Sequence, residues 1–306
     1  MDHDTIMILS IKTWDLLMND NDYPALFCAT DLASNKTQKI FISLNVSYLI
    51  IAILGTTTAF FDNSKLLAIL TASLFLIGLF LLIIILTKKY DQKWYSCRAI
   101  AESIKTATWR FMMKSEPYDD SKTDGQAKAE FRNLLRELLK NNTSIADLIG
   151  GEVSEQEQIT PKMLEVRNLK LVDRISFYLL NRIDEQRKWY AKKYTINKKN
   201  NLIWFLLVIL FNSVAGVLAI IKISAPSLEK LPIDIFAVIA VSSLTWIQLK
   251  RYQDLTSSYA LTAHEIGTIR GISEEVKTEE EFSDFVIDTE NAFSREHTQW
   301  IAKRSS

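Results

Sequence analysis

The 306-residue chain is poor in the residues that form tight turns and in those that bind metals. Its 8 glycines and 5 prolines are too few for the turns of a β-sandwich or barrel, so helices should dominate. Cys28 and Cys97 are the only cysteines and cannot form a zinc site alone; we expect two reduced thiols, with a disulfide as the alternative. Equal totals of 36 basic and 36 acidic residues give no bulk positive field, which argues against nucleic acid as a partner.

Catalytic motifs are also missing from the sequence. Gly150-Gly151 is the only glycine pair, and no Gly-Lys-Ser follows it, so there is no phosphate-binding loop. There is no HExxH motif, no CxxC motif and no nucleophile elbow, and His264 beside Glu265 lacks a second histidine at zinc-helix spacing. We therefore expect no catalytic residues, no metal, no cofactor and no enzymatic activity.

Long apolar runs are what the chain does have. Three runs of 20 to 22 residues carry no charge, and a shorter fourth run has Asp234 near its start. Such lengths match the roughly 20 helical residues that cross a bilayer core; Pro232 can open the fourth helix and Asp234 can lie at the interface. A soluble bundle could bury one such helix, but four in one chain indicate membrane spans. The predicted fold is all-α, with four transmembrane helices in two hairpins and long cytoplasmic helical extensions; the spans are 41–61, 66–87, 202–221 and 233–249.

The two halves of the chain look related. Each has a polar helix leading into the membrane, a short turn, and an outgoing helix in which a tyrosine precedes a glutamate by six or seven residues. These pairs are Tyr95 with Glu102 and Tyr259 with Glu265. The similarity favours a duplicated two-span unit. We predict units at 1–114 and 162–306, joined by a cytoplasmic linker with a short helix at 115–161.

Helical spacing predicts four further elements. A helix from Pro24 should run straight into the first span, and shorter helices should cover 127–140 and 278–303. A long helix should run from Pro161 into the third span, with a broad apolar stripe that includes Val172 and Tyr178.

Basic residues mark one side of the four spans. Nine of them flank the span ends on that side, whereas three lie in the two short turns opposite. Under the positive-inside rule, both termini and the long central region are cytoplasmic, and the first span would act as an uncleaved anchor. The nine are Lys36, Lys39, Lys88, Lys89, Lys93, Lys198, Lys199, Lys250 and Arg251.

A few polar residues lie inside the spans. Asn212 is at the middle of the third span, Ser213 follows it, and Asn45 lies in the first span. An unpaired amide in hydrocarbon costs several kcal/mol, so Asn212 should face another helix or water. It can form an interhelical hydrogen bond, or it can line a pore built by several subunits. No charge lies deep in any span, which argues against a coupled transporter.

Charged residues outside the spans form two candidate cytoplasmic motifs. Arg98 and Glu102 are four residues apart on one helix; they can form an ordinary side-chain pair or a clamp between subunits just below the membrane. Glu265 is the counterpart of Glu102 in the second half. Arg295-Glu296-His297 is a dense triplet that fits the end of an amphipathic helix with surface ion pairs.

Several strings in both halves resemble the SLATT family, the SMODS- and SLOG-associating two-transmembrane effectors. The resemblance suggests two SLATT-like units in tandem and is most specific in the closing string 294–300; it assigns no role to 115–161. The matching strings are Tyr23-Pro24-Ala25-Leu26-Phe27 with Asp31 and Gln38; Trp94, Arg98, Ala101-Glu102-Ser103 and Trp109-Arg110-Phe111; Tyr178-Leu179, Arg182, Asp184-Glu185-Gln186 and Trp189-Tyr190; and Thr262-Ala263, Glu265, Glu290 and Ser294-Arg295-Glu296-His297.

The resemblance implies a membrane effector of a bacterial antiviral defence system. Such a protein would be a helical homo-oligomer in the inner membrane that opens a pore or disrupts the bilayer on infection, with a sensor or nucleotide-signal protein as partner. The family brings no catalytic residues. A membrane-anchored scaffold or sensor without a pore is the alternative, and a transporter is a third, weaker reading.

Overall fold

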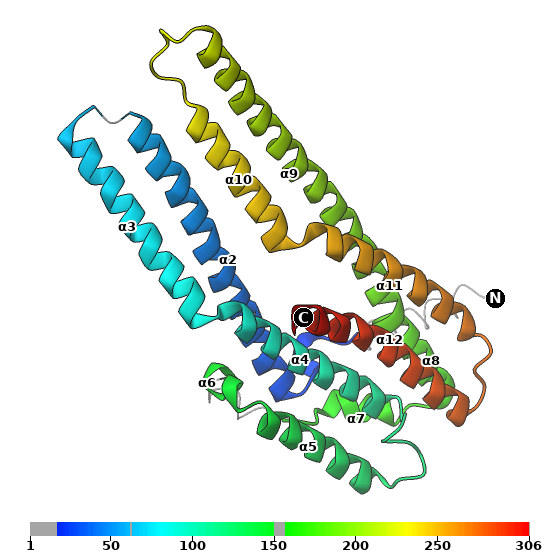
Figure 1. Ribbon diagram of the computed structural model, residues 1–306. Coiled ribbons are helices and arrows are strands. Elements are labelled where there is room, and N and C mark those ends of the chain that lie inside the picture. Colours follow the sequence, from blue (N-terminus) through cyan, green and yellow to red (C-terminus); the bar gives the residue numbers. More distant parts are fainter. Residues whose placement is uncertain (1–16, 62, 150–156, 306) are drawn as a thin grey trace. The chain divides into compact units, whose positions relative to one another are not determined.

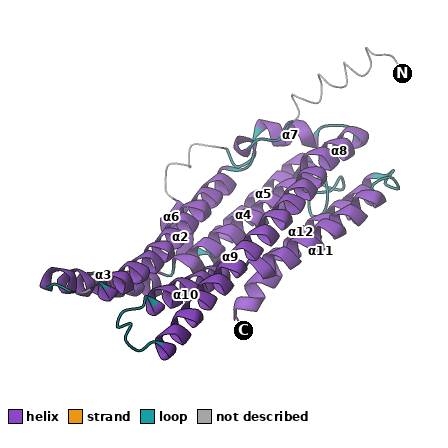
Figure 2. Cartoon of the chain, turned by 90° about the horizontal axis from the view of Figure 1, so that it is seen from above, coloured by secondary structure: helices purple, strands orange, loops and turns teal. Residues whose placement is uncertain are grey.

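The computed structural model describes residues 17–61, 63–149 and 157–305, and this part of the chain contains helices and loops but no strand (Figure 2). The chain forms two compact units. Of the described residues, those within 37–92 and 192–259 form a span unit, and those within 17–36, 93–191 and 260–305 form a polar unit. Each unit therefore draws on both halves of the sequence.

The first hairpin of the span unit consists of α2 (Ala25–Phe60) and α3 (Lys65–Lys88), drawn in blue and cyan in Figure 1. The predicted helix from Pro24 into the first span is confirmed, because α2 runs through both segments without a break. Ser64 begins α3 by accepting a hydrogen bond from the Leu67 N–H at 3.3 Å. The Thr71 hydroxyl donates to the Thr58 hydroxyl at 2.9 Å and joins the two helices near their turn.

The second hairpin consists of α9 (Glu185–Ser224) and α10 (Ile233–Lys250) (Figure 1). Aromatic pairs join the helices near both ends: Trp204 with Trp246, ring centres 5.9 Å apart, and Phe211 with Phe236, at 6.2 Å. The described chain has four helices long and apolar enough to cross a membrane, which confirms the four predicted spans. Their large apolar side chains are mostly exposed on the single chain, as expected for surfaces that face lipid.

Eight longer helical segments and four short ones build the described part of the polar unit. Its core is rich in aromatic side chains: Trp109, Phe111, Phe131, Tyr178 and Phe282 are all buried. The longer segments are the start of α2, α4 (Tyr90–Met112), α5 (Asp124–Asn141), α7 (Pro161–Arg167), α8 (Leu171–Tyr178), the start of α9, the end of α11 (Tyr252–Ile272) and α12 (Glu279–Ser305). The short ones are η1 (Asp20–Asp22), η2 (Thr143–Ile145), α6 (Ala146–Ile149) and a π-helical segment (Leu179–Asp184).

The predicted helices over 127–140 and 278–303 are confirmed as α5 and α12. α5 begins three residues earlier than predicted, where Thr123 and Gln126 form a reciprocal capping box. This helix is not a bare linker element, since its Ala127, Phe131 and Leu135 are buried in the core of the polar unit.

The long helix predicted from Pro161 into the third span is wrong in its first half. α7 ends at Arg167, and the Asn168 N–H closes it by bonding to the carbonyls of Leu164 and Glu165. A short break follows before α8, and a π-helical segment, Leu179–Asp184, lies between α8 and α9. The break changes which side of the chain faces the core. Val172, which belongs to the predicted apolar stripe, is 72% exposed, whereas Arg174 is 1% exposed.

Candidate functional site

A buried ion pair lies at the centre of the polar unit. Glu290 of α12 and Arg182 of the π-helical segment are 0% and 2% exposed. The Arg182 Nε donates to Glu290 Oε1 at 2.8 Å and its Nη2 donates to Oε2 at 2.7 Å. Tyr178 donates its hydroxyl to the same Oε1 at 2.9 Å, and Thr106 of α4 donates to Oε2 at 3.0 Å. Four donors from three elements thus surround the carboxylate, as a buried charge requires.

Aromatic rings enclose the guanidinium of Arg182. Its Cζ lies 4.6 Å from the centre of the Phe293 ring and 6.0 Å from the Trp109 ring. Trp109 in turn donates its indole N–H to the Tyr23 hydroxyl at 3.2 Å. Burial raises the pKa of the Tyr23 and Tyr178 hydroxyls. Burial lowers the pKa of Arg182, but the Glu290 carboxylate more than reverses this, so the guanidinium stays charged.

The π-helical segment presents this arginine. Asn181, Arg182 and Ile183 are three consecutive buried residues, more than one stripe of an α-helix would bury. The wider turn accommodates them, and such turns often occur at functional positions. The Asn181 side-chain oxygen also accepts the Met18 N–H at 3.3 Å, which ties the segment before η1 to this point.

Two more buried arginines hold the C-terminal end of α4. Arg167 donates to the Phe111 carbonyl at 2.7 Å, and Arg174 donates to the Met113 carbonyl at 2.8 Å. Cations are favoured there because the last carbonyls of a helix lack partners and carry partial negative charge. Each guanidinium also pairs with a carboxylate of another helix, Asp124 of α5 at 3.2 Å for Arg167 and Glu279 of α12 for Arg174. These pairs organise the polar unit rather than expose a reactive group.

A polar seam joins α4 to α12. Arg110 donates to the Asn291 side-chain oxygen at 2.7 Å. Ser115, just after α4, donates its hydroxyl to the Ser283 carbonyl at 2.8 Å, and the Glu116 N–H donates to the Ser283 hydroxyl at 3.2 Å. The pairing order shows that the two helices are antiparallel. The outgoing helix of the first half is thus bound to the last helix of the second half.

The predicted pair Arg98–Glu102 forms within one chain. Its nitrogen–oxygen distance is 2.6 Å, and Arg98 also reaches Asp31 of α2 at 3.4 Å. The second half has an analogous contact, since Arg270 of α11 pairs with Asp184 at 3.2 Å. In each half, therefore, an aspartate that precedes the hairpin pairs with an arginine of the helix that follows the hairpin. The spacing of residues in the sequence did not indicate this correspondence. Glu265 lies half-buried on α11, and the side chains of Arg295, Glu296 and His297 lie outside the described ones.

Two of the three candidate polar residues of the spans, Asn45 and Asn212, form hydrogen bonds within their own helices. Asn45 donates to the Phe41 carbonyl at 2.8 Å and Asn212 donates to the Val208 carbonyl at 3.0 Å. Asn45 is half-buried, whereas Asn212 and Ser213 are exposed on the single chain. Asn212 thus forms no bond to a neighbouring helix of this chain, and its side-chain oxygen has no hydrogen bond within the described residues.

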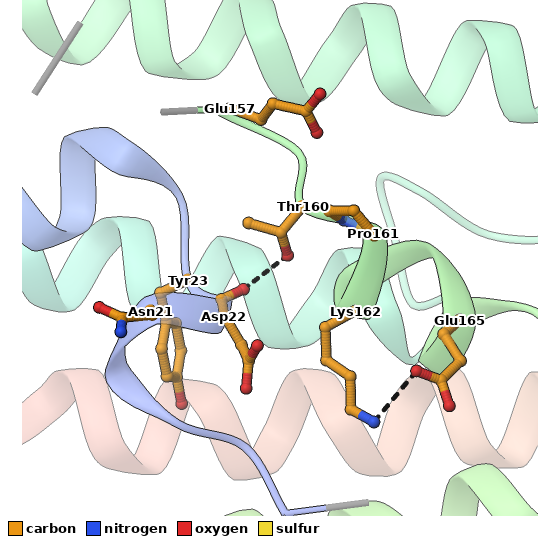
Figure 3. A pocket seen from close by; sticks show the side chains of 8 residues that line it. All are labelled: Asn21, Asp22, Tyr23, Glu157, Thr160, Pro161, Lys162 and Glu165. Carbon is orange, nitrogen blue, oxygen red and sulfur yellow. Dashed lines mark hydrogen bonds and ion pairs between the residues drawn. The ribbon is translucent and has the colours of Figure 1, made fainter. Parts of the chain in front are cut away.

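A pocket of about 800 Å³ lies elsewhere in the polar unit, at the junction of η1 with α7 (Figure 3). Its polar groups mainly serve the fold. Thr160 donates its hydroxyl to the Asp22 carbonyl at 2.7 Å and also caps α7, and Lys162 pairs with Glu165 at 3.0 Å. The Glu157 carbonyl accepts the Ala25 N–H at 3.2 Å. The described residues contain no cluster of three metal-binding side chains, and we assign no ligand to this pocket.

Comparison with known proteins gives two family matches in tandem. Residues 24–175 match the SMODS and SLOG-associating 2TM effector domain 3, and residues 178–300 match the SMODS and SLOG-associating 2TM effector domain 1. The first match continues through residues 115–161, beyond the predicted boundary at 114. No curated protein and no solved structure matches the chain.

Proposed function

Because the chain belongs to the SLATT family, whose two-span effector domain it carries twice, we propose that it is a non-enzymatic, pore-forming membrane effector. In this proposal several copies assemble in the inner membrane of a bacterium, with both termini in the cytoplasm. A sensor or nucleotide-signal protein of the same antiviral defence system triggers them. The open assembly dissipates the ion gradients of the infected cell.

The exposed side chain of Asn212 carries this proposal. It lies midway along a span. Its side-chain N–H bonds to the Val208 carbonyl, and its amide oxygen has no hydrogen bond within the described residues. In hydrocarbon an unpaired amide oxygen is costly. Ser213 beside it and Gly216 one turn later are also exposed and small, which lets another helix or a water-filled path come close. Assembly of copies around α9 would supply that environment.

The polar unit supports the alternative of a membrane-anchored scaffold or sensor. It has a closed core and a saturated ion pair between Arg182 and Glu290, so it is a well-defined body outside the spans. A scaffold would need the spans only as anchors. If the protein forms a pore, replacing a polar residue of the span should change ion flow. If it is a scaffold, the same replacement should have no such effect.

Ion flow in cells separates the two functions. We would express the full chain in bacteria and measure membrane potential and entry of an impermeant dye, beside Asn212→Leu. The matched control is Thr245→Val, which removes an exposed span hydroxyl that already bonds to its own helix at 2.9 Å. We expect rapid depolarisation with the parent and the control, and its loss with Asn212→Leu at an equal amount of protein in the membrane.

Purified chain in dye-loaded vesicles completes the test. Leakage with the parent but not with Asn212→Leu supports a pore near α9. Equal leakage from both variants would remove Asn212 from the pathway. Intact vesicles and intact cells, also when the chain is co-expressed with its neighbouring genes, would overturn the pore and favour the scaffold.

A further inference from the structure

The outer side of α5 carries four basic residues at intervals of four, which place them in one stripe about 18 Å long. Three of them are exposed and the first is half-buried, and none forms an ion pair within the described chain. The acids next to them on the helix do not neutralise the stripe, because Glu130 pairs with Lys122 at 2.7 Å and Glu137 forms no ion pair with a described residue. The members of this α5 basic stripe are Lys128, Arg132, Arg136 and Lys140.

The α5 basic stripe is unfavourable for the chain by itself. Like charges four residues apart on a helix repel each other, and the stripe contains three such neighbouring pairs. The core does not require these residues, because Ala127, Phe131 and Leu135 fill the buried side of α5. An acidic surface lying along the stripe would replace the repulsion by attraction.

The outer side of α12 has the complementary pattern. Glu280, Asp284 and Asp288 are exposed, again follow at intervals of four, and form a stripe about 12 Å long. They too lack an ion pair among the residues that the structure describes. We call these three the α12 acidic stripe. The two stripes have opposite charge and the same spacing along their helices.

Within one chain α4 separates the two helices that carry the stripes. Figure 1 shows α4 between α5 and α12 in the polar unit. Phe111 of α4 packs on Phe131 of α5, with ring centres 5.1 Å apart, and Arg110 of α4 donates to Asn291 of α12 at 2.7 Å. A partner for either stripe must therefore come from outside the chain.

We propose that the α5 basic stripe of one copy of this chain binds the α12 acidic stripe of a second copy. This inference rests on the proposed assembly of copies and names the surfaces that meet in it. Both stripes follow the i, i+4 ridge of a helix, and such ridges align when two helices cross at about −50°. The contact leaves one stripe of each copy free, so it repeats from head to tail and can close into a ring.

An anionic membrane surface fits the α5 basic stripe less well than a second copy does. Helices that lie on membranes insert an apolar face beside their basic residues. The apolar stripe of α5 is instead buried in the core, and Leu139 is its one large apolar residue that is exposed. A membrane would also leave the α12 acidic stripe without a partner.

Charge reversal in the purified full chain tests the contact. Sedimentation velocity in a mild neutral detergent would measure self-association of the parent, of Arg132→Glu with Arg136→Glu, and of Asp284→Lys with Asp288→Lys. We expect each double variant to associate about tenfold more weakly, because like charges then face each other. High salt should weaken association of the parent.

Mixing the two double variants gives the decisive result. One then has acidic residues in both stripes and the other has basic residues in both, so an equimolar mixture should associate about as strongly as the parent. The control reverses two exposed charges elsewhere in the polar unit, Lys170→Glu with Lys188→Glu, and should associate like the parent. Circular dichroism would verify that all variants are folded. A mixture that stays as weak as its components, or a control that is equally weak, would overturn the proposal.

Dye leakage from vesicles, measured on the same samples, separates this proposal from the pore. Association that depends on the stripes without leakage overturns the pore and supports the contact. Leakage and association that charge reversal leaves unchanged overturn the contact and keep the pore, and a parent that stays monomeric overturns both. If Arg132→Glu with Arg136→Glu associates like the parent but no longer binds phosphatidylglycerol vesicles, the α5 basic stripe is a membrane-binding surface and the proposal is wrong.

Discussion

The Arg182 guanidinium and the Glu290 carboxylate form an ion pair through two hydrogen bonds, of 2.8 and 2.7 Å, although the two residues are 108 positions apart in the sequence. The pair joins the helix that precedes the third span to the last helix of the chain, and Thr106 adds a donor from the first half. It therefore connects both family domains inside the polar unit.

Loss of one charge from this pair should be costly. Glu290→Gln leaves Arg182 buried without its counter-charge, and we expect it to lower the free energy of unfolding by about 3–5 kcal/mol. Arg182→Met combined with Glu290→Met should cost less than Glu290→Gln alone, because no isolated charge remains. Arg98→Gln, at a half-exposed pair, should cost below ~1 kcal/mol. Urea unfolding in mild detergent, followed by tryptophan fluorescence, measures all three; equal losses for the single and double variants would contradict this account.

A left-handed basic residue follows the second helix of each hairpin. Lys89 after α3 has φ 47°, and Arg251 after α10 has φ 50°. A non-glycine residue pays about 1 kcal/mol for this conformation, which glycine adopts freely. Lys89→Gly should therefore raise the free energy of unfolding by up to ~1 kcal/mol, and Gln92→Gly, inside α4, should lower it by a similar amount. If both glycines destabilise equally, the conformation at Lys89 carries no strain.

The hydroxyl pair Thr58–Thr71 is a polar contact between α2 and α3 in the first hairpin. We expect Thr71→Val to lower hairpin stability by about 0.6 kcal/mol, a typical value for hydrogen bonds between helices in membranes. Ser73→Ala serves as the control, because that exposed hydroxyl bonds to the Ile69 carbonyl of its own helix. Unfolding of the chain in mixed micelles gives both values, and an equal effect at the two sites would show that the interhelical bond adds nothing.

Alkaline pH should destabilise the polar unit through its buried tyrosines. Burial raises the pKa of Tyr118, so the folded chain keeps a proton that the unfolded chain loses above about pH 10. The stabilisation is complete below that pH and declines above it, by up to ~1.4 kcal/mol per pH unit for each such group. Tyr118→Phe should reduce the loss between pH 10 and 11 in urea unfolding.

Lys105 should act in the opposite sense over a lower pH range. Burial lowers the pKa of its ammonium group, so the unfolded chain binds more protons there, and stability rises with pH up to about 10.4. Lys105→Met should therefore remove this rise in stability as the pH approaches about 10.4 from below. An unchanged slope would show that the ammonium, which lies 5.6 Å from the centre of the Tyr23 ring, is solvated in the folded chain.

The four spans and the helices α5 and α12 could be predicted from the sequence because the residue patterns that indicate them are local. A run of 20 uncharged apolar residues has few stable states besides a membrane-spanning helix, whatever its neighbours. The same holds for α5 and α12, where periodic apolar positions stand beside polar ones. The exact start of α5 was not predicted, because the capping box of Thr123 with Gln126 that sets it is seen only in the structure.

The tertiary structure decided which charges are buried. Arg174 and Arg182 look like Arg187 in the sequence, yet the first two are buried and Arg187 is exposed. Their carboxylate partners lie 105 and 108 residues away, so no local pattern reveals the pairing. The break after Arg167 and the π-helical turn decide which side of the chain faces the core, because each rotates the following residues. The sequence by itself determined that this protein crosses a membrane four times with helices; packing alone determined which of its many charges hold the polar unit together.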